Sequence, residues 1–218
     1  MNFLRQQDLL NPGDVPFPIT IIGCGGIGSW VTLALAKMGC PDISVVDFDV
    51  VEAHNLPTQF FTPQDLYGHK SRKLADNVER FTGIRPKHFA AMVPQEEVPL
   101  KGLVISGVDS MAMRQEIWEK IRQEPETEWY IDGRMGATIL ELYTVKMDSK
   151  SDIQYYESTL GSDFEAYPLP CTAQAIAFTV FGLAAEVGSQ VFKIAKDRRV
   201  ERCIWRDYSS NLFLKEVR

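Results

Sequence analysis

The sequence predicts an α/β fold built on a doubly wound, mainly parallel sheet that ends in antiparallel strands. Short apolar runs alternate with segments of helical spacing over residues 19–132, which is the pattern of a parallel sheet. A turn of glycines joins the first run to the first helix, as in Rossmann-like folds. The predicted strands are 19–22, 43–49, 87–92, 103–109, 128–132 and 138–145, and the segments 202–205 and 211–215 predict a closing antiparallel hairpin.

Helical spacing places helices between these strands. The predicted helices are 3–10, the run from Gly28 to Gly39, 70–81, 111–122 and a long helix that begins near Cys171. The apolar run 173–192 is interrupted by polar residues, so we interpret it as a buried helix and not as a membrane span. Residues 50–63 and the polar stretch 148–167 predict irregular structure. We find no repeat and no domain boundary, and expect residues 1–218 to form a single domain.

Residues 23–28, Gly-Cys-Gly-Gly-Ile-Gly, predict a phosphate-binding turn. Gly23 lets the chain turn tightly after the first strand. Gly25 and Gly26 let backbone N–H groups approach a phosphate, and Gly28 lets the helix pack against the sheet.

Two features around this turn extend the prediction to a nucleotide. The helix that follows directs its positive N-terminal end at the same place. Asp47 lies about 20 residues beyond the last glycine, where an acid commonly accepts hydrogen bonds from a ribose hydroxyl.

Composition limits the classes of function. The chain has 218 residues, of which 45% are apolar and 24% charged, and its net charge of −6 argues against general nucleic-acid binding. Four widely spaced cysteines without a CxxC pair favour a reducing cytosol and predict neither a disulfide framework nor a zinc site. Residues 1–8 lack an apolar signal core, so we expect a cytoplasmic protein without a membrane segment.

Several motifs occur in a specific order. They are the GxGGxG turn, the segment 46–51 followed by Asn55-Leu56 and Gln59, Gly68-His69-Lys70, Ser106-Gly107-Val108-Asp109-Ser110 with Arg114, and Phe3-Leu4-Arg5-Gln6. They resemble the glycine loop and the DxD…NLxRQ, G-x-K, TDN…R and Y-x-RQ motifs of the ThiF/MoeB/HesA family. Members of this family are adenylating enzymes related to ubiquitin-activating enzymes.

The resemblance implies an activity, cofactors and partners. Such enzymes use ATP and Mg²⁺ to adenylate the C-terminal carboxylate of a ubiquitin-like or sulfur-carrier protein and release pyrophosphate. The resemblance also implies a homodimer, in which Arg5 reaches the phosphates bound by the neighbouring subunit. The nucleotide contacts that it implies are Gly23, Gly25, Gly26, Gly28, Asp47, Asp49, Asn55, Gln59 and Lys70.

Two further roles come from the resemblance. Asp109 would hold Mg²⁺, which prefers hard oxygen ligands. Cys171, which precedes a long apolar helix, would accept the activated carboxylate as a thioester or another thiol linkage. Arg5, Lys70, Asp109 and Cys171 are therefore the predicted catalytic residues.

The sequence departs from the family pattern in two places. Thr58 stands where the NLxRQ segment has arginine, so one charge that faces the phosphates is missing unless Arg72 or Arg134 supplies it. The paired CxxC motifs that hold zinc in many relatives are absent, which makes this a short form for which we predict no structural zinc.

Each implied role has a plainer alternative. Asp109 could be the N-cap of the next helix, Lys70 a solvated lysine, and Cys171 a small buried residue. The glycine turn and Asp47 suit an NAD-dependent oxidoreductase equally well. Thr58 supports a non-catalytic, ThiF-like binding subunit. Within the family, the substrate could also be a small molecule, a peptide terminus or a modified nucleoside.

Overall fold

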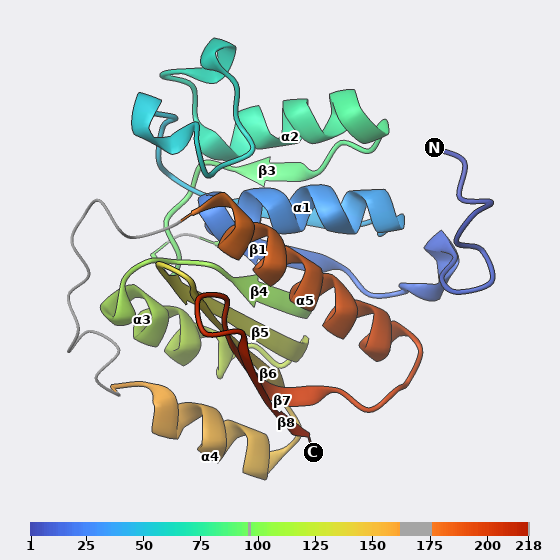
Figure 1. Ribbon diagram of the computed structural model, residues 1–218, viewed down its shortest axis with the longest axis vertical. Coiled ribbons are helices and arrows are strands. Elements are labelled where there is room, and N and C mark those ends of the chain that lie inside the picture. Colours follow the sequence, from blue (N-terminus) through green and yellow to red (C-terminus); the bar gives the residue numbers. More distant parts are fainter. Residues whose placement is uncertain (96, 162–175, 218) are drawn as a thin grey trace.

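The computed structural model describes residues 1–95, 97–161 and 176–217. Its centre is an eight-stranded sheet of order β3-β2-β1-β4-β5-β6-β7-β8 (Figure 1). The strands are β1 (Ile19–Ile22), β2 (Ile43–Val46), β3 (Lys87–Phe89), β4 (Gly102–Ser106), β5 (Thr127–Gly136), β6 (Ile139–Lys146), β7 (Glu201–Asp207) and β8 (Leu212–Val217).

The type of strand pairing changes once across the sheet, from parallel to antiparallel at β5. The first five strands of that order are parallel, and β5 through β8 pair antiparallel, so β5 is parallel to β4 and antiparallel to β6. This arrangement confirms the predicted Rossmann-like sheet with C-terminal antiparallel strands.

Helices cover both faces of the sheet (Figure 1). Apolar side chains of α1 (Gly26–Met38), α2 (Lys70–Thr82) and α5 (Ala177–Ala195) belong to one core cluster, and those of α3 (Met111–Ile121) and α4 (Lys150–Thr159) belong to a second. α5 buries one side and leaves Phe178 and Phe181 exposed, so the predicted buried helix is buried on one side only. No helix of the described residues is long and apolar enough to cross a bilayer.

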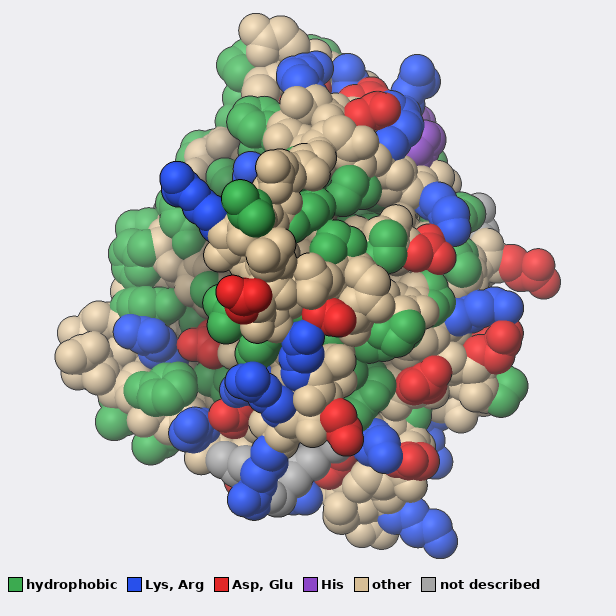
Figure 2. All heavy atoms as spheres, turned by 90° about the vertical axis from the view of Figure 1, so that its right-hand side faces the viewer, with side chains coloured by type: hydrophobic (Ala, Val, Ile, Leu, Met, Phe, Trp, Pro, Cys, Tyr) green, Lys and Arg blue, Asp and Glu red, His purple; other side chains and the backbone are tan. Residues whose placement is uncertain are grey.

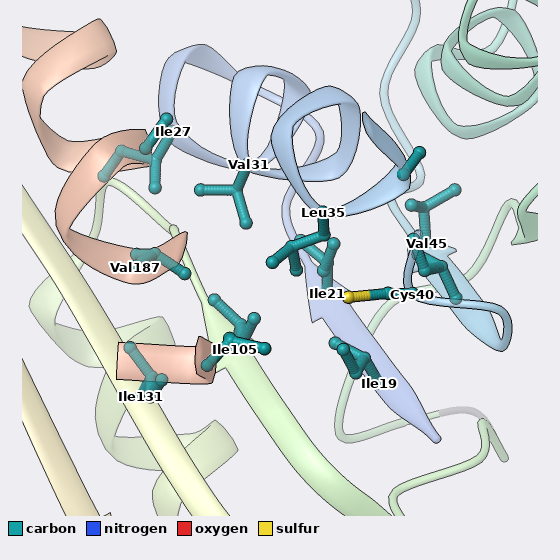
Figure 3. Close-up of a cluster of buried hydrophobic side chains, with 14 of the residues drawn as sticks. Ile19, Ile21, Ile27, Val31, Leu35, Cys40, Val45, Ile105, Ile131 and Val187 are labelled. Atoms are coloured by element: carbon teal, nitrogen blue, oxygen red, sulfur yellow. The ribbon is translucent and has the colours of Figure 1, made fainter. Parts of the chain in front are cut away.

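The core between α1, α5 and the sheet fixes the end of α1 that carries the glycine turn. Figure 3 shows Val31 and Leu35 of α1 with Ile21 and Ile105 of the central strands, and all four are fully buried. Each such side chain contributes about 1.5–3 kcal/mol relative to exposure. The glycine turn is thus attached to a helix whose inner side is fully buried in the core.

The structure corrects the predicted helix over residues 3–10. Residues 4–9 form turns instead. Gln6 Nε2 donates to the carbonyls of Leu10 at 3.1 Å and Met38 at 2.7 Å, so a side chain ties this segment to the end of α1.

Polar helices and strand ends were also predicted incompletely. α4 lies within the stretch 148–167 that we expected to be irregular. Its buried residues are Asp152 and Tyr156 alone, so its apolar periodicity is weak. Residues 50–63 contain short 3-10 turns, β3 is shorter than predicted, and β5 extends to Gly136 because its last residues pair with β6.

The start of α5 differs from the prediction as well. The described helix begins at Ala177, and Ile176 precedes it with extended backbone. The predicted start near Cys171 lies outside the described residues.

Candidate nucleotide-binding site

The candidate site lies at the carboxyl ends of β1, β2 and β4. β1 pairs with β2 on one side and β4 on the other, and the helices that follow β1 and β4 cover opposite faces. Ligands bind parallel α/β sheets in the crevice at such a switch point. The N–H of Gly23 bonds to the Val46 carbonyl at 2.9 Å, and the N–H of Gly107 bonds to the Ile22 carbonyl at 3.0 Å, so backbone bonds join all three strand ends.

Two glycines of the turn are required by close backbone contacts. Gly23 has φ of +91°, and a Cβ there would lie 2.9 Å from the Gly107 carbonyl oxygen. A Cβ on Gly28 would lie 1.8 Å from the carbonyl oxygen of Gly23. The glycine turn and the loop after β4 therefore pack backbone against backbone, and α1 begins directly behind them.

Asp47 fixes the geometry of this turn. One carboxylate oxygen accepts the N–H of Cys24 at 2.6 Å, and the other accepts the N–H of Asp49 at 2.8 Å. Burial raises the pKa of Asp47, although these two N–H groups oppose the shift. Each carboxylate oxygen has a second acceptor position. Asp47 can therefore hold the turn and still accept a ribose hydroxyl.

Lys70 is presented by the first turn of α2 and is not a solvated lysine. The residue is only 8% exposed, and its Nζ lies 2.9 Å from Asp49 Oδ2. Both residues line an open pocket of about 150 Å³ together with Val50, Glu52, His54 and Asn55. A buried ammonium at the mouth of a polar pocket is suited to neutralising phosphate oxygens.

Asn55 and Gln59 come from the irregular segment after β2. Asn55 is buried, and its Oδ1 accepts the N–H of Glu52 at 2.9 Å. Gln59 Nε2 lies 3.9 Å from where a Cβ on Gly25 would stand. The Oε1 of Gln59 is buried and has no hydrogen-bond partner within the described residues. The Gln59 amide thus lies over the glycine turn with bonding capacity left for a ligand.

Asp109 is exposed on the loop between β4 and α3. The N-cap of α3 is Ser110, whose hydroxyl accepts the N–H of Met113 at 3.3 Å, so the cap role that Asp109 could have filled belongs to its neighbour. An exposed carboxylate next to a phosphate turn fits Mg²⁺, which proteins commonly hold with one or two carboxylates plus substrate phosphates. The described residues contain no group of three or more acidic, His or Cys ligands.

Arg5 lies away from the glycine turn of its own chain. It lines a pocket of about 410 Å³ with Phe3, Gln6 and Lys37, next to the C-terminal end of α1. A helix of 13 residues is about 20 Å long, so the length of α1 separates Arg5 from the turn. Within one chain the structure does not bring Arg5 to the site.

The two proposed substitutes for the missing arginine differ in their surroundings. Arg134 is buried and donates to Asp132 and Thr159, and Arg72 is an exposed residue of α2. Thr58 itself contributes its backbone carbonyl, which accepts the Trp30 indole N–H at 2.9 Å. Cys171 lies outside the described residues.

The structure also reveals a buried ionic cluster that sequence reasoning missed. Asp132 is fully buried, and its carboxylate oxygens lie 2.9 Å from Arg114 Nε and 2.7 Å from Arg134 Nε. Burial would lower the pKa of Arg114, but the Asp132 carboxylate reverses this effect and raises it. The available signal was an acid directly after the apolar run Trp129-Tyr130-Ile131.

Comparison with known sequences gives relatives that match about half of this chain or less. The NEDD8-activating enzyme E1 catalytic subunit of Arabidopsis thaliana is 30% identical over 130 residues, 52% of this chain and 29% of that protein. A protein named probable adenylyltransferase/sulfurtransferase MoeZ, from Mycobacterium tuberculosis, is 32% identical over 102 residues, 44% of this chain and 26% of that protein. This chain therefore spans less than a third of the length of these two relatives.

Solved structures share the fold at low identity. The crystal structure of E. coli MccB with AMPCPP and MccA has a TM-score of 0.70 at 19% identity, and the match covers 100% of this chain and 67% of that chain. The crystal structure of PaaA has a TM-score of 0.72 at 18% identity, covering 94% and 74%. A family model described as ThiF family matches residues 16–125, half of the sequence. The chain belongs to the ThiF family.

Proposed function

We propose that this protein is an ATP-dependent adenylyltransferase that activates a C-terminal carboxylate. The observation that carries the proposal is the carboxylate of Asp109, which is exposed and does not cap α3. It is presented by a loop that packs against the glycine turn. Membership of the ThiF family and the names of the relatives support the same activity. We further propose that residues 1–218 form one adenylation domain.

The proposed substrate is the C-terminal carboxylate of a ubiquitin-like or sulfur-carrier protein. A carboxylate oxygen attacks the α-phosphorus of ATP, a new O–P bond forms, and the bond to the β-phosphate oxygen breaks with release of pyrophosphate. Negative charge on the phosphates must be held in place while this happens, and positioning with charge neutralisation supplies most of such catalysis.

Different residues contact the phosphates, the nucleoside and the metal. Backbone N–H groups of the glycine turn and the N-terminal end of α1 face the phosphates, and Lys70 exchanges Asp49 for a phosphate oxygen. Asp47 and Asn55 hold the nucleoside side. Asp109 would hold Mg²⁺, which supplies charge neutralisation between phosphates when bound.

The central experiment is pyrophosphate exchange with Asp109→Asn. The substitution keeps the size of the side chain and removes its charge, so we expect exchange to fall at least about a hundredfold while the unfolding curve stays unchanged. Asp148→Asn, which alters another exposed carboxylate, should keep full exchange. Full exchange by Asp109→Asn would contradict the proposed metal role.

Two further measurements separate this function from its alternatives. Calorimetry should show binding of ATP with Mg²⁺ in preference to NAD, and tight NAD binding without ATP binding would favour an oxidoreductase. Incubation with ATP and candidate carrier proteins, followed by intact mass, should show which carboxylate is activated. Absence of exchange by the isolated protein with every carrier would favour a binding subunit that needs a partner, in line with Thr58.

A further inference from the structure

The buried ionic cluster lies directly behind the loop that carries Asp109. Asp132 ends the stretch of β5 that pairs with β4, and its register partner in β4 is Ser106, the last residue before that loop. One oxygen of Asp132 accepts from Arg114 Nε at 2.9 Å. The other accepts from Arg134 Nε at 2.7 Å and from the Tyr156 hydroxyl at 3.0 Å.

Arg114 connects this fixed carboxylate to the loop. Its Nη2 donates to the carbonyl oxygen of Val108 at 2.6 Å, and Val108 is the residue before Asp109. The rigid, planar guanidinium can bond two acceptors at a fixed angle, which a lysine ammonium cannot reproduce. The position of the Asp132 carboxylate therefore sets the position of the Val108 carbonyl.

The carboxylate itself is held by Arg134 of the same strand and by Tyr156 of α4. Arg134 donates to the carbonyl and hydroxyl oxygens of Thr159 at the end of α4, at 3.2 and 3.0 Å, and its guanidinium lies 4.5 Å from the centre of the Tyr143 ring. Tyr156 of α4 is fully buried, and its hydroxyl donates to the Asp132 carboxylate. A chain of contacts thus runs from α4 through Asp132 and Arg114 to the Asp109 loop.

Charge balance distinguishes the roles of Arg114 and Arg134. The cluster has two guanidinium groups and one carboxylate, so a single arginine would neutralise Asp132. Arg134, together with Tyr156, already occupies one Asp132 oxygen. Arg114 is the additional buried charge, and it is the one that holds the loop.

We propose that Arg114, oriented by Asp132, is a positioning residue that fixes the 107–109 loop so that the Asp109 carboxylate is held in place for the metal. This inference rests on the proposed function for the role of Asp109, but the fixing of the loop can be tested without nucleotide. Arg114→Met is the variant of choice, because it keeps much of the side-chain volume and leaves Asp132 paired with Arg134.

The first test measures amide hydrogen exchange over residues 107–113 in the absence of ligand. The N–H groups of Gly107 and Met113 are hydrogen-bonded in this segment. In Arg114→Met we expect these amides to exchange about tenfold faster, as for loss of a hydrogen bond to a charged group. Arg122→Met removes an arginine just after the same helix, one that is paired with Glu157, and should leave these rates unchanged. Unchanged exchange in Arg114→Met would overturn the inference.

The second test measures ATP binding by calorimetry over a range of Mg²⁺ concentrations. Arg114→Met should raise the Mg²⁺ concentration for half-saturation about tenfold and leave ATP affinity without Mg²⁺ unchanged. Arg114→Lys should give a smaller rise. If Asp109→Asn raises this concentration and Arg114→Met does not, the inference is wrong. If Asp109→Asn has no effect, the proposed metal role fails, and only the fixing of the loop survives, decided by the exchange rates.

Discussion

At Gly28 the addition of one methyl group would create a steric clash with the backbone of the glycine turn. A Cβ there would lie 1.8 Å from the carbonyl oxygen of Gly23, which is backbone and cannot move aside as a flexible side chain can. We expect Gly28→Ala to lower the free energy of unfolding by about 3 kcal/mol or more and to abolish ATP binding, as measured by urea denaturation and calorimetry.

Gly13→Ala is a matched control for this change. A Cβ at Gly13 would meet no atom within 4 Å, and its φ is not in the left-handed region. This variant should keep both stability and ATP binding. If Gly28→Ala behaves in the same way, the close contact between the turn and the start of α1 is wrong.

Cys171 can be tested independently of its position. If it accepts the activated carboxylate, Cys171→Ala should retain pyrophosphate exchange but form no thiol-sensitive adduct with the carrier, as read by intact mass with and without reductant. Cys40→Ala, at a buried cysteine of the core, should still form the adduct. An adduct that persists in Cys171→Ala would leave Cys171 as a residue without a role in transfer.

Residues of the site differed in how far sequence could predict them. The glycines and Asp47 are readable because their geometry depends on contacts within one strand–turn–helix–strand unit. Asp132 is paired with Arg114, 18 positions earlier, and with Tyr156, 24 positions later, so its role appears only when three elements meet.

At the scale of elements, Asp132 ties α3, β5 and α4 together. Asp132→Asn removes the carboxylate and leaves two buried guanidinium groups facing each other without a counter-charge. Breaking such a buried pair commonly costs about 3–5 kcal/mol, and we expect a loss of this size in chemical denaturation.

A graded comparison distinguishes charge from packing in this cluster. Tyr156→Phe removes one hydrogen bond to Asp132 and keeps the ring, so it should cost only about 1 kcal/mol. If Asp132→Asn costs no more than Tyr156→Phe, the charge of Asp132 contributes little, and the cluster is held mainly by its aromatic contacts.

Helices and strands were predictable where their apolar residues form a continuous run or follow a clear period. β1, β2 and β4 are short apolar runs that are buried throughout, and α5 shows a broad apolar side. α4 buries only Asp152 and Tyr156, so its helical period is hidden by polar residues, and tertiary contacts decide its structure.

At the scale of the whole molecule, the position of Arg5 decides whether the site is shared. Because α1 separates Arg5 from its own glycine turn, a role at the phosphates requires the Arg5 of the partner subunit in a homodimer. Arg5→Ala and Lys70→Met should then each be inactive alone. A mixture allowed to exchange subunits should recover about a quarter of the wild-type exchange rate, because half of the dimers are mixed and each contains one intact site.

The control for the subunit-mixing experiment is the oligomeric state of each variant. Light scattering should show a dimer at micromolar concentration for the wild type and for both variants. A clean, active monomer would remove the shared site, as would a mixture of dimeric variants that exchange subunits without recovering activity. Charge on the surface gives no simple guide to the interface, since acidic and basic side chains are interspersed on the face shown in Figure 2.

The contact between Gly23 and Gly107 has a consequence for the order of folding. β1 obtains its second neighbour only when β4 arrives, and Ile19 pairs with Leu103 far along the chain. β5 with β6, and β7 with β8, are in contrast neighbours in the chain and are joined by short turns. Distant pairings form late because they close long loops. The glycine turn therefore acquires its packing against Gly107 only after β4 has entered the sheet. We expect ATP to bind the complete fold and to stabilise no earlier folding intermediate.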